Sequence, residues 1–165
     1  MSATELHASN ASNASNDQNI KVLNDLIEVT LDSADGYREA AKDTRNLDFK
    51  ALFERRSVER NRLTEKLQTE VRDLGGEPED DGTVLASAHR MFLNLKHIVT
   101  GSDLGIVNEV EAGEDHIKTK YEDALSQEYL SAPVRGAVSS AYEMIKADHD
   151  QMSTLKATTE KNNIH

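Results

Sequence analysis

The sequence predicts an all-α protein: a bundle of four long helices, with one additional helix between two helical hairpins. Apolar and small residues recur at alternating spacings of three and four positions over long stretches, which is the period of a bundle helix. Only two prolines occur in the 165 residues, Pro78 and Pro133, and both fall between helical patterns. Aromatic residues make up 4% of the chain and tryptophan is absent, so we expect a largely aliphatic core.

The first two helices are expected over residues 17–44 and 46–74. Their expected buried stripes consist of Ile20, Leu23, Ile27, Thr30, Ala34, Tyr37 and Ala41 in the first, and of Leu52, Glu59, Leu63, Leu67, Val71 and Leu74 in the second. Asn46 or Asp48 can cap the second helix at its start, and the two glycines at 75–76 are a common signal for its end.

Three more helices are expected over residues 83–100, 104–128 and 131–157. The stripes of the last two consist of Val107, Val110, Glu114, Ile117, Tyr121 and Ala124, and of Val134, Val138, Ala141, Ile145, Asp148, Met152 and Leu155. Two helix pairs with a connecting helix between them indicate two antiparallel hairpins joined by a long crossover, which is the ferritin-like topology. An up-and-down bundle with an extra helix is the structural alternative.

One bundle domain, residues 18–157, accounts for all five helices. Residues 1–17 repeat the triplet Ala-Ser-Asn and hold almost no apolar side chain, so we expect a disordered N-terminal tail. Residues 158–165 are polar and are expected to fray. The run over 54–62 carries charges of both signs and is expected to be a solvated helix face, the alternative being a surface for an acidic partner or a second copy of this chain.

The composition excludes several classes of function. A net charge of −11 argues against nucleic acid or an anionic membrane surface as a partner, because phosphate binding needs a basic face. The absence of cysteine excludes disulfides, thiolate chemistry and cysteine-ligated metal centres. The sequence shows no secretory signal and no apolar run of about 18 residues, so we expect a soluble cytoplasmic protein. Homo-oligomerisation is compatible with this pattern, since bundle helices often expose a second apolar face.

Several motifs resemble those of a known superfamily. The motif Gly-Glu-Asp at 113–115, followed by Tyr121, resembles the third core helix of rubrerythrins, and Tyr37 and Glu59 match the first two helices in the same way. Residues 19–157 as a whole resemble a bacterial four-helix-bundle family of unknown function in the ferritin-like superfamily. The segments that carry this resemblance most strongly are LNDLIEVTLDSADGYREAA, NLKHIVTGSD and EAGEDHIKTKYEDAL. The resemblance implies the ferritin-like fold and, by association with superfamily relatives, a role related to stress.

The resemblance also implies where metal ligands would lie. Iron-binding members of the superfamily use one Glu from each of two helices and a Glu-x-x-His pair from each of the other two. The six corresponding positions hold Thr30, Glu59, Arg62, Glu114, Lys146 and His149. Three of the six positions therefore keep a residue that can bind a metal, namely Glu59, Glu114 and His149.

The replaced positions suggest how the remaining carboxylates are compensated. Glu59 and Glu114 fall on expected buried stripes, where a carboxylate is costly unless a metal or a cation compensates it. Arg62 and Lys146 cannot coordinate a metal as cations, and two carboxylates beside two cations sum to zero charge. We therefore interpret the position as a former metal site closed by salt bridges, in which Arg62 pairs with one glutamate and Lys146 with the other. No cofactor is expected in such a site.

Two hypotheses of function follow. The one we prefer is a non-catalytic structural or interaction protein with an unidentified protein partner. The alternative is a metal-dependent oxidase, a peroxidase-like protein or a mononuclear metal-binding protein that uses Glu59, Glu114 and His149 to hold iron, manganese or zinc. Arg62 and Lys146 discriminate between them: cations that point into the bundle favour the first, and cations that point outward and leave the glutamates facing a cavity favour the second.

Two runs of acidic residues and histidine, at 115–116 and 148–150, have the composition of metal sites. Neighbours one residue apart point about 100° away from each other on a helix, so we expect neither run to converge on a metal by itself. His149 can equally be a histidine at the edge of its helix that makes one hydrogen bond and binds no metal.

Overall fold

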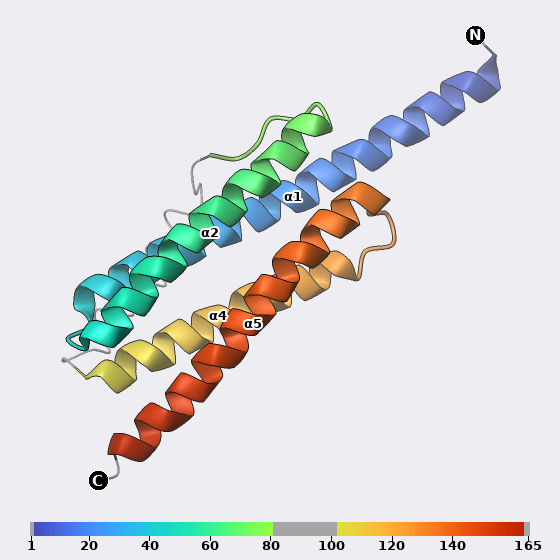
Figure 1. Ribbon diagram of the computed structural model, residues 1–165. Coiled ribbons are helices and arrows are strands. Elements are labelled where there is room, and N and C mark those ends of the chain that lie inside the picture. Colours follow the sequence, from blue (N-terminus) through green and yellow to red (C-terminus); the bar gives the residue numbers. More distant parts are fainter. Residues whose placement is uncertain (1, 81–101, 164–165) are drawn as a thin grey trace.

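Four helices make up the part of the chain that the computed structural model describes, residues 2–80 and 102–163. They are α1 (Ala3–Asp43), α2 (Leu47–Asp73), α4 (Asp103–Leu125) and α5 (Ala132–Asn163). The first two form one hairpin, and α4 and α5 form the other (Figure 1). The prediction of an all-α protein built from two helical hairpins is confirmed for these residues, and the additional helix expected over 83–100 lies outside them.

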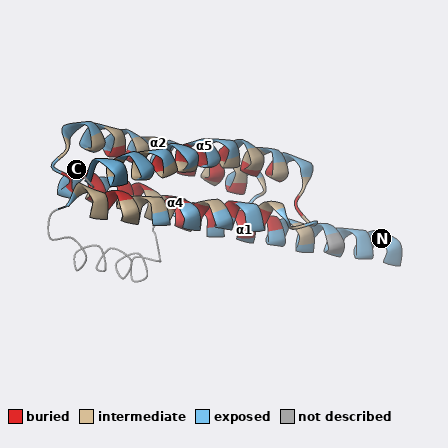
Figure 2. Cartoon of the chain, turned by 90° about the horizontal axis from the view of Figure 1, so that it is seen from below, coloured by how far each residue is buried: buried red, intermediate tan, exposed pale blue. Residues whose placement is uncertain are grey.

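The two hairpins pack on each other mainly through α1 and α4, while α2 and α5 make fewer contacts. Buried positions follow the inward face of each helix and exposed positions the outward face (Figure 2). No helix within the two described ranges is long and apolar enough to cross a membrane. The structure is thus a set of amphipathic helices around a shared interior.

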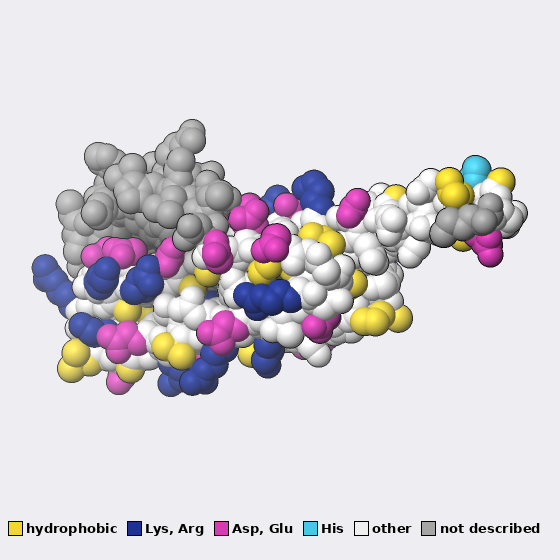
Figure 3. All heavy atoms as spheres, turned by 90° about the horizontal axis from the view of Figure 1, so that it is seen from above, with side chains coloured by type: hydrophobic (Ala, Val, Ile, Leu, Met, Phe, Trp, Pro, Cys, Tyr) yellow, Lys and Arg dark blue, Asp and Glu magenta, His cyan; other side chains and the backbone are white. Residues whose placement is uncertain are grey.

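Helix α1 begins at Ala3, well before the start that the sequence predicted, and its first part extends beyond the bundle (Figures 1 and 2). The Ser2 hydroxyl accepts a hydrogen bond from the Glu5 amide, and the Glu5 carboxylate accepts one from the Ser2 amide at 2.7 Å. This capping box and the alanine at every third position favour a helix even where nothing is buried. The segment that we expected to be disordered is therefore helical here, as an exposed and mostly uncharged arm (Figure 3).

Both ends of α2 follow the predicted signals. Asn46, one of the two predicted caps, accepts hydrogen bonds from two amides in the first turn of α2. This helix ends in a Schellman motif, in which Gly75 has a φ of 79° and the Gly76 amide donates to the Val71 carbonyl at 3.0 Å. Helix α5 continues to Asn163, past the expected end at 157.

The apolar core consists of two clusters with a polar layer between them. The larger cluster includes Leu23, Ile27, Leu67, Ile117, Tyr121, Val138 and Ile145. The smaller cluster contains Tyr37, Ala40, Ala41, Phe53, Ile106, Val107 and Met152. Along α2, α4 and α5, the buried residues between these clusters include Arg60, Glu114 and Asp148, respectively. The fold therefore brings one cation and two acids together inside the bundle.

Candidate functional site

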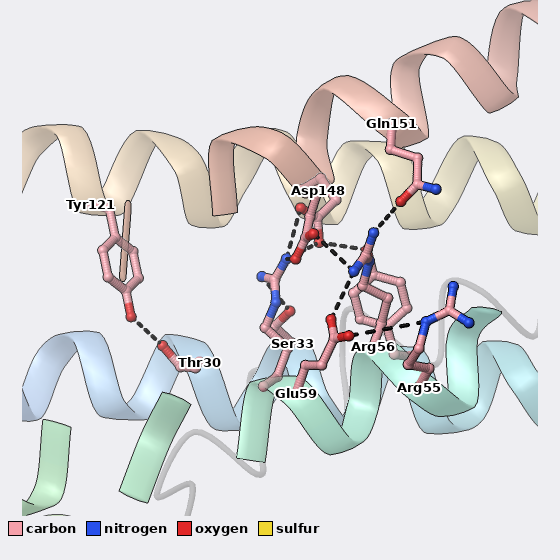
Figure 4. A network of polar contacts seen from close by, with 11 residues as sticks. Thr30, Ser33, Arg55, Arg56, Glu59, Tyr121, Asp148 and Gln151 are labelled. Atoms are coloured by element: carbon pink, nitrogen blue, oxygen red, sulfur yellow. Dashed lines mark hydrogen bonds and ion pairs between the residues drawn. The ribbon is translucent and has the colours of Figure 1, made fainter. Parts of the chain in front are cut away.

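Arg60 on α2 is the largest fully buried side chain of the described residues, with 1% of its surface exposed. Its Nη2 atom donates to both carboxylate oxygens of Glu114 on α4, at 2.9 and 3.0 Å, and to Asp148 Oδ2 on α5, at 3.1 Å. Its Nη1 atom donates to Ser33 Oγ on α1, at 3.1 Å (Figure 4). One guanidinium thus contacts all three of the other described helices.

Glu114 is equally buried and has a second donor. The Tyr37 hydroxyl on α1 donates to Glu114 Oε1 at 2.7 Å, and the Tyr37 ring centroid lies 5.6 Å from the Arg60 guanidinium carbon, within cation–π range. Burial and the charge of Glu114 raise the pKa of Tyr37 well above its ordinary value, so the phenol keeps the proton that it donates. Both oxygens of Glu114 therefore accept hydrogen bonds from protein donors.

Arg56, one helical turn before Arg60, extends the network to the edge of the bundle. Its Nη1 atom lies 2.9 Å from Asp148 Oδ1 and 2.7 Å from Glu59 Oε2, and its Nη2 atom donates to Gln151 (Figure 4). Partial burial raises the pKa of Asp148, and the two arginines only partly offset this effect. We call this set the charge layer; it consists of Arg56, Glu59, Arg60, Glu114 and Asp148.

The charge layer contains both predicted glutamates, but the cations that compensate them differ from the prediction. Arg62 and Lys146 are exposed, so their expected pairing with the glutamates is wrong. Two other arginines of α2 take that role, and Asp148 adds a third carboxylate that the ligand pattern did not include.

The error lies in the predicted stripe of α2. The buried positions of this helix are Phe53, Ser57, Arg60, Leu63, Thr64, Leu67 and Val71. Near its start the predicted stripe ran one residue too early, through Leu52 and Glu59, which are only partly buried. One residue is about 100° on a helix, so Arg62 lies about 200° from Arg60 and faces solvent. Three of the buried positions are polar, so a search for apolar periodicity does not find them. The sequence offered one sign that Arg60 is buried: it follows the apolar Phe53 by seven residues, which is about two helical turns.

Thr30, which the resemblance placed at the first ligand position, forms a separate neutral contact. Its hydroxyl donates to the Leu26 carbonyl at 2.6 Å. Since this uses its single hydrogen, Thr30 accepts the hydrogen bond from the Tyr121 hydroxyl at 2.8 Å (Figure 4). Burial raises the pKa of Tyr121 to about 12, so the phenol keeps the proton that it donates. Thr30 thus links α1 to α4 without a charge.

His149 makes its contacts outside the charge layer. Its Nε2 atom lies 2.5 Å from Asp115 Oδ1, and its Nδ1 atom lies 3.3 Å from Asp150 Oδ1. Partial burial lowers the pKa of His149, but the hydrogen bonds to the two aspartates outweigh it and raise the pKa above its ordinary value. Within the described ranges, one group of three acidic or histidine side chains brings a ligand atom of each member within 4.8 Å of the others: Glu111, Asp115 and His149. The predicted set of three ligands is therefore divided between this contact and the charge layer.

A groove of about 370 Å³ opens between α2 and α5. Its walls include Leu63, Leu67, Ala137, Ala141 and Met144. No member of the charge layer lines this groove, so it provides no route to the buried carboxylates.

A protein-family model described as DUF2383: Domain of unknown function matches residues 18–127, which is more than half of the chain. A search of curated proteins finds no match. The matched residues run from within α1 to the end of α4, so Asp148 and His149 on α5 lie outside them.

Proposed function

The chain belongs to DUF2383, a family of unknown function, and we propose from the geometry of the charge layer that it is a non-catalytic, ferritin-like bundle protein with a structural or interaction role. In this proposal the charge layer fills the position at which iron-binding ferritin-like proteins hold their metal. The observation that carries the proposal is the buried contact between Arg60 and both oxygens of Glu114.

Arg60 opposes a metal at this position in two ways. Its Nη2 atom, at 2.9 and 3.0 Å, occupies one acceptor position on each oxygen of Glu114, and the Tyr37 hydroxyl occupies a second position on Oε1. Its charge also repels a divalent cation by about 8 kcal/mol at a separation of about 4 Å, since each pair of unit charges contributes about 4 kcal/mol at an intermediate effective dielectric. Moving Arg60 aside would leave a guanidinium buried and unpaired, which is strongly unfavourable.

The charge layer also supports a structural role, because it connects all four described helices. Ser33 and Tyr37 of α1 bind Arg60 and Glu114, which bridge α2 and α4, and Asp148 adds α5. A buried ionic network adds little net stability, but sliding one helix against another would separate its charges. We therefore expect the charge layer to determine the register in which the two hairpins meet.

The exposure of Arg62 and Lys146, the cations at the replaced ligand positions, adds little support to the metalloenzyme alternative. Their outward orientation favours that alternative only if the glutamates are left facing a cavity. Both glutamates are instead held by arginines, Glu59 by Arg56 and Glu114 by Arg60.

The test is the iron content of the full chain, purified without a tag and reconstituted anaerobically with Fe(II). We expect wild type and Glu114→Gln to bind the same amount of iron, and exposure to oxygen to produce no absorption band of a di-iron(III) centre. Two equivalents of iron that are lost in Glu114→Gln would overturn the proposal. Asp115→Asn is the matched control, because iron that depends on Asp115 is bound at the contact with His149.

A further inference from the structure

A second polar cluster lies where α4 and α5 face each other at the surface of the bundle. Glu111 and Asp115 are one helical turn apart on α4, so their carboxylates share a face, and His149 reaches them from α5. One ligand atom of each residue lies within 4.8 Å of the others. The closest pair is His149 Nε2 and Asp115 Oδ1, at 2.5 Å. Three metal-binding side chains from two helices thus converge on one point.

The second ring nitrogen of His149 orients the imidazole for this point. Its Nδ1 atom lies 3.3 Å from Asp150 Oδ1, so a proton on Nδ1 is donated to that carboxylate. The lone pair on Nε2 then points toward Asp115, which offers only acceptors when ionised. A lone pair that faces a carboxylate is stable only with a proton or a cation between them. Imidazoles that bind metals are held in this way, by a carboxylate on the other nitrogen.

The cluster has enough excess negative charge to bind a divalent cation. Three carboxylates surround the imidazole, those of Glu111, Asp115 and Asp150, whereas one ammonium, that of Lys156, lies 3.1 Å from Glu111. Lys118, which also acts on the imidazole, is paired with Glu122 at 3.3 Å. With a neutral imidazole, the cluster carries two uncompensated negative charges.

We propose that Glu111, Asp115 and His149 form a site for one divalent first-row transition-metal ion such as Zn²⁺. Mixed imidazole and carboxylate ligands suit these ions, whereas Ca²⁺ and Mg²⁺ prefer oxygen ligands alone. Water completes the coordination, since Asp115 is 59% exposed. The ion joins α4 to α5 at the surface and is independent of the charge layer.

The test is calorimetric titration of the full, tag-free chain with Zn²⁺, with Co²⁺ absorption as a second readout of the ligand geometry. We expect one equivalent to bind, and His149→Asn to weaken that binding by at least 10-fold, as loss of a group at a metal site does. His116→Asn is the matched control: it removes an exposed histidine next to Asp115 that points to another side of α4. We expect it to leave the affinity unchanged.

Two further variants keep the test decisive if His149→Asn fails to fold. Asp115→Asn changes an exposed side chain, and we expect it to weaken Zn²⁺ binding as His149→Asn does. Lys156→Met removes the ammonium that competes for Glu111, and we expect it to tighten binding several-fold. No binding to the wild type, or equal affinity in wild type and Asp115→Asn, would overturn the proposal.

Discussion

Arg60 on α2 donates to both carboxylate oxygens of Glu114 on α4, and each residue is 1% exposed. Removing two opposite charges from water this completely costs several kcal/mol for each ion, so their attraction leaves little net stabilisation. The pair does make each charge dependent on the other. Loss of Arg60 leaves Glu114 buried without its cation, and loss of Glu114 leaves Arg60 with Asp148 as its remaining carboxylate. The first two predictions follow from this dependence.

Glu114→Gln is expected to lower the free energy of unfolding by about 3 kcal/mol, because Arg60 then faces a neutral amide and keeps Asp148 as its remaining carboxylate. Glu59→Gln makes the same chemical change at the edge of the charge layer. Its side chain is 29% exposed, and Arg56 keeps its contact with Asp148, so we expect a loss of about 1 kcal/mol or less. Urea denaturation of both variants measures the difference, and equal losses would contradict it.

Arg60→Met is expected to cost about 3–5 kcal/mol of unfolding free energy, because Glu114 then remains buried without its cation. The matched control is Arg62→Met, on the exposed side of the same helix, which should change stability by no more than about 0.5 kcal/mol. The double variant Arg60→Met/Glu114→Leu removes both charges and should be more stable than either single variant. A double variant whose loss equals the sum of the single losses would show that the two charges are not coupled.

The stripes of α4 and α5 could be predicted from the sequence because each is apolar with one polar interruption. Glu114 and Asp148 were both placed on these stripes, and both are buried. On α2 the buried positions Ser57, Arg60 and Thr64 are polar, so apolar periodicity could not locate them. The position of the charge layer could thus be inferred from two helices, whereas its cations could not.

The contact between Asp115 and His149 was missed for a different reason. The sequence argument compares neighbours on one helix, and even there His149 Nδ1 and Asp150 Oδ1 lie 3.3 Å apart. It does not apply to two residues on different helices, which meet when the helices have the right rotation and axial position. These quantities depend on the packing of the whole hairpin, and periodicity within one helix does not contain them.

Asp32 on α1 is expected to make the protein less stable as the pH rises from about 4 to 6. Burial, followed by the charges of Asp35 and Glu28, raises the pKa of Asp32 from 3.8 to about 6. The folded state therefore holds a proton that the unfolded state has lost over this interval, so ionisation disfavours folding. Asp32→Asn should remove this dependence and stabilise the protein at pH 7 by up to about 1 kcal/mol, after allowing for solvent screening.

Urea denaturation at pH 4.5 and pH 7 measures the effect of Asp32. The control is Asp17→Asn, which removes the same charge from an exposed position of the same helix. It should change the free energy of unfolding by the same small amount at both pH values. A wild-type protein that gains stability between the two values, with no change in Asp32→Asn, would contradict the assignment.

Asn19 separates the exposed arm of α1 from the packed part of the helix. It is 1% exposed, its Nδ2 atom donates to the Tyr129 carbonyl at 3.2 Å, and its Oδ1 atom accepts from the Ser131 amide at 3.0 Å. Asn19→Ala leaves both groups of the α4–α5 loop without their partner, so we expect a loss of about 2–4 kcal/mol in unfolding free energy.

Deletion of residues 2–14 tests whether the exposed arm of α1 contributes to stability. The side chains described in this range are exposed, and the Ser15 carbonyl that accepts from Asn19 is retained. We therefore expect the unfolding free energy to change by no more than about 0.5 kcal/mol, since a solvated helix in isolation is marginal. A truncation that destabilises the protein as much as Asn19→Ala would mean that the arm is held by contacts outside the single bundle, such as a second copy of the chain. Denaturation at two protein concentrations would then detect that association, because a dimer gains stability with concentration.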